Sequence, residues 1–294
     1  MTVPTGSSST RAISWMIAAT LVFVCTNTLV KLLGDTYDVI QITWARYTFH
    51  FVIIALLLGP KTFEVMKTRH PRMQLTRSAL LLCSSLLYFT GFTLLTLAES
   101  AAMINVTPVL VTVLSALILR ETVGIRRWVG VIAGFIGVLI VIRPGFGGFS
   151  SAAFFPLAAA LSYGLYQIAT RHVSHADSPM TSVAYTALVG TVLGSCVVPF
   201  FWTMPDALGW VMMLTLGGTG ALGHYCMIRA YSAAPVSVAA PFAYAIIIWM
   251  AAMGYFVFGN TPGIWTVVGA IVIAASGLYI AQRENIHKAE RGSG

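Results

Sequence analysis

Polar and aromatic side chains occur at helical spacing inside long apolar stretches of this 294-residue sequence. Tyr163, Tyr166 and Gln167 follow i, i+3, i+4 spacing, which places them on one face of a helix. Aromatic rings suit the apolar part of a ligand, and an amide fixes a polar part. Packing between helices is the alternative for each aromatic residue taken alone.

Residues of the same kind recur in the other apolar stretches. As a set they favour a cavity that accepts a small amphipathic solute, lined also by Asn27, Ser85, Tyr88, Asn105, His224, Tyr244 and Trp249. His50 and His224 are candidate proton carriers, because imidazole titrates near neutral pH. A hydrogen-bonded packing role is the alternative for both histidines.

Arg46 lies about two helical turns inside an apolar stretch, where a charge is costly and therefore indicates function. Together with Lys31, it could bind the carboxylate of a substrate. Two structural interpretations stay open: the side chain extends to the membrane surface, or it pairs with an acidic residue near the outer face, for which the candidates are Asp35, Asp38 and Glu99.

The composition indicates that these residues are held in a membrane. The chain is 57% hydrophobic and 9% charged, whereas soluble proteins average about 45–50% apolar and about 25% charged residues. A spanning helix needs about 20 apolar residues. Long runs contain no Asp, Glu, Lys or Arg: 12–30, 78–98, 100–119, 144–170, 178–205, 207–228 and 230–282. These observations predict an all-α polytopic membrane protein and argue against a soluble enzyme or a nucleic-acid-binding domain.

Breaks at charged residues, Pro and Gly predict ten transmembrane helices. Their approximate limits are 12–33, 38–58, 77–98, 100–119, 125–143, 151–171, 180–199, 208–229, 235–257 and 263–282. With the amino terminus in the cytoplasm, 14 of the 17 Lys and Arg residues lie in the loops on that side, as the positive-inside rule requires. Both termini are therefore expected to be cytoplasmic, and the polar residues 1–10 are expected to be disordered.

The two halves of the chain resemble each other. Asn27 and Lys31 in the first span correspond to Gln167 and Arg171, which lie 140 residues later. We therefore predict two five-helix repeats, followed by a cytoplasmic tail, with the limits 1–145, 146–283 and 284–294. An odd number of spans inverts the second repeat relative to the first, an arrangement typical of secondary transporters. Pro108 and Pro241 can kink their helices in the two repeats and are candidate hinges.

Several motifs resemble those of the drug/metabolite transporter superfamily, specifically its ten-helix EamA-type members. They are Asn27-x-x-x-Lys31 leading to Arg46, Ser100-Ala-Ala through Pro108 to Arg120-Glu121, Trp128-x-Gly130 with Gly134 and Gly137, Ser162-Tyr-Gly-Leu-Tyr-Gln through Arg171, and Ala240-Pro-Phe through Trp249 to Phe258-Gly259. The second half departs from the family pattern with Asn260, where Glu is usual. The resemblance covers almost the whole chain and is greatest to bacterial exporters of amino acids, including aromatic ones.

The resemblance implies a multi-pass protein of the bacterial inner membrane that exports small metabolites, with amino acids favoured, by alternating access around a central cavity. No cofactor, metal ion, nucleic acid or obligate protein partner is expected, and the partners are the solute and the lipid bilayer. The alternatives are a transporter of other metabolites, such as nucleotide sugars, and an integral membrane enzyme acting on lipids. Such an enzyme would need a cluster of catalytic side chains at a membrane face, and the sequence shows none.

The distribution of basic residues predicts which loops face the cytoplasm. In a chain without native cysteines, Cys substituted for Lys67 or Lys288 should be protected from an impermeant thiol reagent added to intact cells. Cys substituted for Asp38 or Asp206 should react. Labelling at position 67 from outside would overturn the span assignment.

Overall fold

The computed structural model describes residues 6–118, 125–143, 150–173, 177–233 and 240–292. Within these residues the regular secondary structure consists of α-helices and short 3-10 helices. In chain order the elements are α1 (Gly6–Leu33), α2 (Val39–Leu58), α3 (Lys61–Val65), α4 (Pro71–Leu94), α5 (Leu97–Ile104), α6 (Thr107–Ile118), α7 (Ile125–Ile142), η1 (Ser151–Ala153), α8 (Phe154–Val173), α9 (Pro179–Val197), η2 (Val198–Phe201), α10 (Ala207–Ala233), η3 (Ala240–Tyr244), α12 (Ala245–Phe258) and α13 (Ile264–Gly292).

Long apolar helices confirm the multi-pass membrane class. Among the described residues, seven helical stretches are long and apolar enough to cross a bilayer, and three further apolar helices are shorter: Trp128–Ile142, Phe242–Phe258 and Ile264–Ile280. Each of these ten stretches overlaps one of the ten predicted spans. The count of ten stays a prediction, because the last three stretches fall short of the usual length of about 20 residues.

Local sequence signals explain where several helices begin. Asp38 caps α2 by accepting a hydrogen bond from the Ile40 amide at 2.8 Å, and Pro71 occupies the first turn of α4, where its missing N–H costs nothing. Helix α1 starts at Gly6, so residues 6–10 are helical, which differs from the disorder predicted for 1–10. The Ser14 hydroxyl donates to the Thr10 carbonyl at 3.0 Å and supports this first part of the helix.

Polar side chains are buried among apolar ones inside the bundle, and large apolar side chains cover its outside. Arg77 is the largest of the fully buried side chains at 2% exposure, whereas Leu56, Leu57 and Phe256 are 77–80% exposed. Exposed apolar side chains of this size are what a lipid environment requires, and intramembrane charges face the bundle interior.

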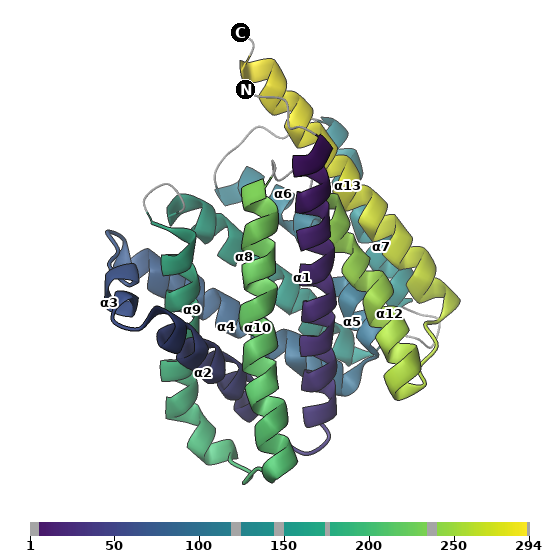
Figure 1. Ribbon diagram of the computed structural model, residues 1–294. Helices are drawn as coiled ribbons and strands as arrows, with labels where there is room; N and C mark the ends of the chain where they lie inside the picture. Colours follow the sequence, from purple (N-terminus) through teal and green to yellow (C-terminus); the bar gives the residue numbers. More distant parts are fainter. Residues whose placement is uncertain (1–5, 119–124, 144–149, 174–176, 234–239, 293–294) are drawn as a thin grey trace.

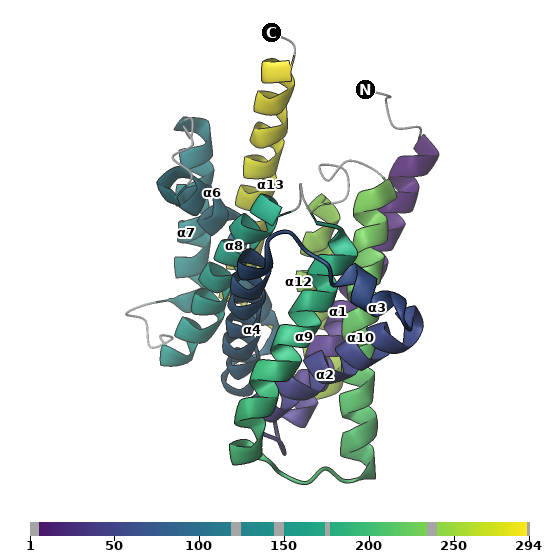
Figure 2. The ribbon, with the colours of Figure 1, turned by 90° about the vertical axis from the view of Figure 1, so that its left-hand side faces the viewer.

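The helices pack in pairs that join distant parts of the chain. Helix α1 lies along α10, α4 along α8, and α7 along α13, while α2 contacts both α9 and α10. In Figures 1 and 2 the start of α1 and the end of α13 lie at the same end of the bundle. The centre of the molecule is therefore bounded by helices from both halves of the sequence.

The predicted fourth span is a broken helix. Helix α5 ends at Ile104 and α6 begins at Thr107, and the Asn105 side-chain amide donates to the Ala101 carbonyl at 2.7 Å. Pro108 consequently lies in the first turn of α6 and follows the break, where it removes no helical hydrogen bond. Pro241 lies in η3, before α12 begins, and its side chain is outside the described part of the chain.

Close packing of α10 on α2 generates a test of the fold. A Cβ at Gly217 would overlap Phe49 and lie 2.9 Å from the His50 backbone nitrogen, whereas one at Gly218 would meet only the Ile53 side chain at 3.7 Å. Gly217→Ala should therefore destabilise the protein by about 1–3 kcal/mol through overpacking and lower the melting temperature.

The matched control is Gly218→Ala, which should leave the melting temperature unchanged or raise it slightly, because Ala favours helix by up to about 1 kcal/mol over Gly. Thermal melts of both variants in one detergent provide the comparison. Equal melting temperatures would show that the α2–α10 contact is looser than described.

Candidate functional site

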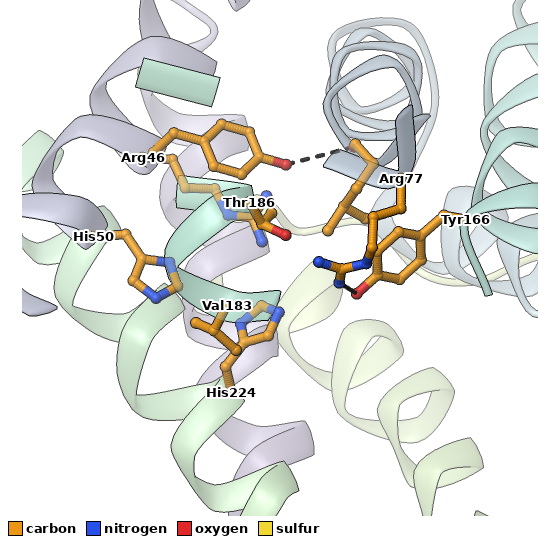
Figure 3. A pocket seen from close by; sticks show the side chains of 9 residues that line it. Arg46, His50, Arg77, Tyr166, Val183, Thr186 and His224 are labelled. Atoms are coloured by element: carbon orange, nitrogen blue, oxygen red, sulfur yellow. Dashed lines mark hydrogen bonds between the residues drawn. The ribbon is translucent and has the colours of Figure 1, made fainter. Parts of the chain in front are cut away.

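A cavity lies between α2, α4, α8, α9 and α10, near the middle of the bundle. Its lining consists of Arg46, Tyr47, His50, Arg77, Leu81, Tyr166, Val183, Thr186 and His224. Arg46 enters it from α2 and Arg77 from α4, with His50 and His224 beside them (Figure 3). Among these described lining residues are two arginines and two histidines but no carboxylate.

Arg46 is held by neutral groups. Its Nη1 donates to the Ser85 hydroxyl at 3.1 Å, and the guanidinium carbon lies 5.1 Å from the Tyr47 ring centroid and 5.4 Å from that of Phe89. The Nε atom is buried and has no hydrogen-bond partner among the described atoms. Arg46 therefore keeps unused donor capacity beside the cavity.

Two acidic residues considered as partners of Arg46 have other roles. Asp38 caps α2, and Glu99 completes a capping box at the start of α5, where its Oε2 accepts hydrogen bonds from the backbone and hydroxyl of Thr96 at 3.1 and 2.9 Å. Both carboxylates are thus used at helix ends. Ser85 is the hydrogen-bond partner that the structure gives Arg46.

Arg77 lines the cavity although it was not among the predicted lining residues, and the same holds for Tyr47, Leu81, Val183 and Thr186. The Arg77 Nε donates to the Thr170 hydroxyl at 3.0 Å, and its Nη2 donates to the Tyr166 hydroxyl at 2.9 Å. Its Nη1 donates to the Gln74 side-chain oxygen and to the Ser182 carbonyl, at 2.9 and 2.8 Å. These acceptors take four of the five N–H groups of Arg77, and none of them carries a charge.

A helix-start signal could have revealed Arg77. The charge-free run begins at residue 78, so Arg77 looks like the last of the cytoplasmic loop cations. Pro71 follows a polar loop and is typical of a first helical turn, and the helix indeed begins there. Starting the third span at Pro71 would have placed Arg77 nearly two turns inside it.

A hydrogen-bonded chain links Arg77 to the loops at one end of the bundle. The Gln74 amide nitrogen donates to the Asp177 carboxylate at 2.8 Å, and the Thr68 hydroxyl donates to the same oxygen. Burial alone would raise the pKa of Asp177, but the hydrogen bonds from Thr68 and Gln74 hold that pKa below its usual value. Because the folded pKa is lowered, this contribution to stability is present above the unfolded-state pKa and is lost as the pH falls through the folded value.

The two histidines lie side by side in the cavity wall. Their ring centroids are 5.6 Å apart, and the His224 ring also packs edge-on against Phe23 at 5.2 Å. The His224 Nδ1 lies 2.9 Å from the Gly220 carbonyl. Because a carbonyl only accepts, Nδ1 carries the hydrogen. The His50 Nε2 is buried without a partner among the described atoms, so it is available to a ligand.

Part of the predicted lining gathers at this cavity. Arg46, Tyr166 and His224 line it, and Ser85 binds Arg46 and accepts or donates a 2.8 Å hydrogen bond with Tyr47. Tyr163 stacks on Tyr166 with ring centroids 5.5 Å apart. Gln167 follows on the same helix but is not among the lining residues.

The other predicted residues lie elsewhere in the bundle. Lys31 donates from Nζ to the carbonyls of Phe92 and Leu95, at 2.6 and 2.8 Å, and so caps the end of α4. Asn105 caps α5. The remaining members pack among helices. The Asn27 amide lies 3.8 Å from the Met250 sulfur, and Tyr88 packs on Phe92. Trp249 packs against the same apolar core, and the Tyr244 hydroxyl lies close to Gly277.

A family model covers most of the chain. The model of the EamA-like transporter family matches twice, over residues 10–143 and over residues 150–281. Each match spans one of the two halves whose helices surround the cavity.

Curated relatives match along nearly the whole length. A riboflavin transporter of Vibrio cholerae is 28% identical over 92% of this chain and 92% of its own length. An S-adenosylmethionine uptake transporter of Rickettsia prowazekii is 22% identical over 93% of both chains. A pseudopaline exporter of Pseudomonas aeruginosa is 23% identical over 90% of this chain and 94% of its own.

A solved structure supports the fold. A crystal structure of a protein at 17% identity superposes with a TM-score of 0.62 and covers 95% of this chain and 99% of that chain. At this identity the likeness concerns the fold alone.

The polar network around Arg77 generates a test of the site's framework. Gln74→Leu keeps the side-chain volume but removes the acceptor for Arg77 and the donor to Asp177. Leaving a buried charged donor unsatisfied costs about 1–3 kcal/mol or more, so the melting temperature should fall by several degrees.

Thr76→Ala is the matched control on the same helix, because Thr76 is exposed and bonds only to the Arg72 carbonyl one turn away. Its effect should stay within about 0.5 kcal/mol. Equal melting temperatures for the Gln74 variant and the wild type would mean that Arg77 finds other acceptors, such as water.

Proposed function

Because the chain belongs to the EamA-like transporter family, we propose that it is a secondary transporter that moves a small metabolite through the central cavity by alternating access. It is a transporter and not an enzyme. The cavity carries this proposal: it lies inside an apolar bundle, yet it is lined by cationic, imidazole, phenol and hydroxyl groups. Intramembrane polar groups of this kind mark solute pathways.

The proposed mechanism uses two inverted repeats, residues 1–145 and 146–283, with ten spans and both termini in the cytoplasm. The double match of the family model supports two repeats. The helix pairs support two repeats as well, because α1 lies along α10 and α4 lies along α8. In the proposed repeats α1 is equivalent to α8, and α4 is equivalent to α10. Each pair therefore joins the first span of one repeat to the third span of the other. Inverted repeats provide two equivalent gates around one site.

Breaks in two helices provide hinges about which the two halves of the chain can move. Helix α5 is separated from α6 by Asn105 and Val106, and η3 precedes α12. These breaks lie near Pro108 and Pro241, in equivalent parts of the proposed repeats. We infer that the two halves rock about these points, since discontinuous helices at a repeat interface are typical of transporters.

The substrate class to test first is a small amphipathic metabolite with a carboxylate, including aromatic amino acids, moved outward across the bacterial inner membrane. Arg46 is the reason to expect a carboxylate on the substrate, because the unused donors of its guanidinium group suit a planar anion. The stacked rings of Tyr163 and Tyr166 offer apolar surface beside the cavity. The curated relatives named above are bacterial and bear names for different solutes and for both directions of transport.

The role of Arg46 generates the functional test. In liposomes that contain only this protein, counterflow of labelled phenylalanine should proceed without ATP. Arg46→Gln should weaken its apparent affinity by about tenfold or more, the loss expected for a charge-assisted hydrogen bond. Phenylalaninamide, which lacks the carboxylate, should be nearly insensitive to the substitution.

Two further variants complete this test. Arg46→Lys should retain part of the affinity, because it keeps the charge without the planar fork. Trp44→Phe is the control, since Trp44 bonds to Ser195 on the neighbouring α9 and is not among the cavity-lining residues. Loss of both ligands alike, with a lower melting temperature, would assign Arg46 a structural role. Absence of counterflow for every solute tried, including riboflavin, would contradict the transport function.

A further inference from the structure

Resting on the proposed function, we propose that Arg46 and Arg77 together form a site for a substrate with two negative charges, in the form of a phosphate monoester or a dicarboxylate. Both guanidinium groups line one cavity (Figure 3). The inference replaces the single carboxylate of the first substrate class by two negative charges, carried either by a phosphate or by a pair of carboxylates.

The charge of the cavity is the first argument. Arg77 is 2% exposed, and its four hydrogen bonds end on neutral oxygens of Gln74, Thr170, Tyr166 and Ser182. Neutral acceptors bind four of the five N–H groups but do not cancel the charge. Buried charges in proteins are usually paired, and the described lining contributes no carboxylate. The compensating charge must therefore enter with the solute.

Unused hydrogen-bonding atoms are the second argument. The Nε of Arg46 and the Nε2 of His50 are buried without partners among the described atoms. Both side chains lie beside Gly220: a Cβ there would be 3.7 Å from the Arg46 Nε and 3.9 Å from the His50 Nδ1. The absence of a side chain at this position leaves room next to both groups. Arginine forks match carboxylate and phosphate oxygens.

The number of cations favours a dianion over other solutes. A single carboxylate would compensate only one of the two guanidinium groups. A zwitterionic amino acid would also bring an ammonium group, for which the described lining has no acidic partner. A phosphate monoester or a dicarboxylate neutralises both cations at once, because it carries two negative charges near neutral pH.

Equilibrium binding to the purified full-length protein in lipid nanodiscs tests the proposal. The first ligand pair is riboflavin 5′-phosphate and riboflavin, which differ only in the phosphate. The second pair is succinate and succinamide, which have similar shape and carry two charges or none. In at least one pair the dianion should bind about tenfold or more tightly than its neutral partner. The pair that shows this preference distinguishes a phosphate from a dicarboxylate.

Variants identify the residues responsible. Arg46→Gln and Arg77→Gln should each remove most of the dianion preference, and Arg77→Lys, which keeps the charge, should retain part of it even if Arg77→Gln fails to fold. Arg229→Gln is the matched control, because it also removes one positive charge, but the Arg229 guanidinium lies over Trp15 and Tyr225, outside the cavity lining. This control should bind like the wild type.

Several outcomes would overturn the inference. Equal binding of the dianion and the neutral partner in both pairs, or binding of neither member, would contradict a dianion site. So would an equal loss of preference in the Arg229 control, which would indicate an effect of overall charge. Because binding is measured without transport, these failures are separate from a failure of counterflow, which would contradict the proposed function alone.

Discussion

The interaction on which the rest of the structure depends is the burial of the Arg77 charge among apolar helices. Its hydrogen bonds join α4 to Thr170 and Tyr166 on α8 and to the Ser182 carbonyl on α9. Each unsatisfied donor of a buried charge would cost about 1–3 kcal/mol or more. The three helices therefore cannot separate around Arg77 unless water or a solute replaces their acceptors. The wall of the cavity and the contact between the two halves of the chain depend on the same side chain.

The two arginines of the cavity are held in different ways. Acceptors from three helices take four of the five N–H groups of Arg77, whereas Arg46 donates from Nη1 to Ser85 and lies against the rings of Tyr47 and Phe89. Arg46 loses little when it turns toward an anionic partner, because its Nε is unpaired among the described atoms and an anion adds attraction between opposite charges to the hydrogen bonds. A solute bound as proposed would meet one cation fixed to the helix framework and one with a donor to spare.

Much of the architecture could be predicted from the sequence, because long runs without charge leave few places for loops. Of the predicted span limits, 125–143 and 180–199 lie close to α7 (Ile125–Ile142) and α9 (Pro179–Val197). The site was predicted only in part. Arg46 stood out because it interrupts an apolar run, but Arg77 is adjacent to a polar loop and looks like a loop residue until the start of α4 is known. Lys31 looked like a ligand-binding cation, and only the three-dimensional structure brings it to the carbonyls at the end of α4.

The fold leaves the choice of solute to the cavity lining. Curated relatives that match 90% or more of this chain bear the names of a riboflavin transporter, an S-adenosylmethionine uptake transporter and a pseudopaline exporter. One architecture therefore serves chemically different solutes, as is general for widely used folds. In this chain the nine lining residues come from five helices, so each helix contributes only a few side chains to the site. Exchanging a lining residue that is not bonded to several helices, such as Arg46, changes the charge of the cavity while the apolar contacts that hold the bundle stay in place. The charge of the lining, set here by Arg46 and Arg77, is consequently a better guide to the solute than the fold.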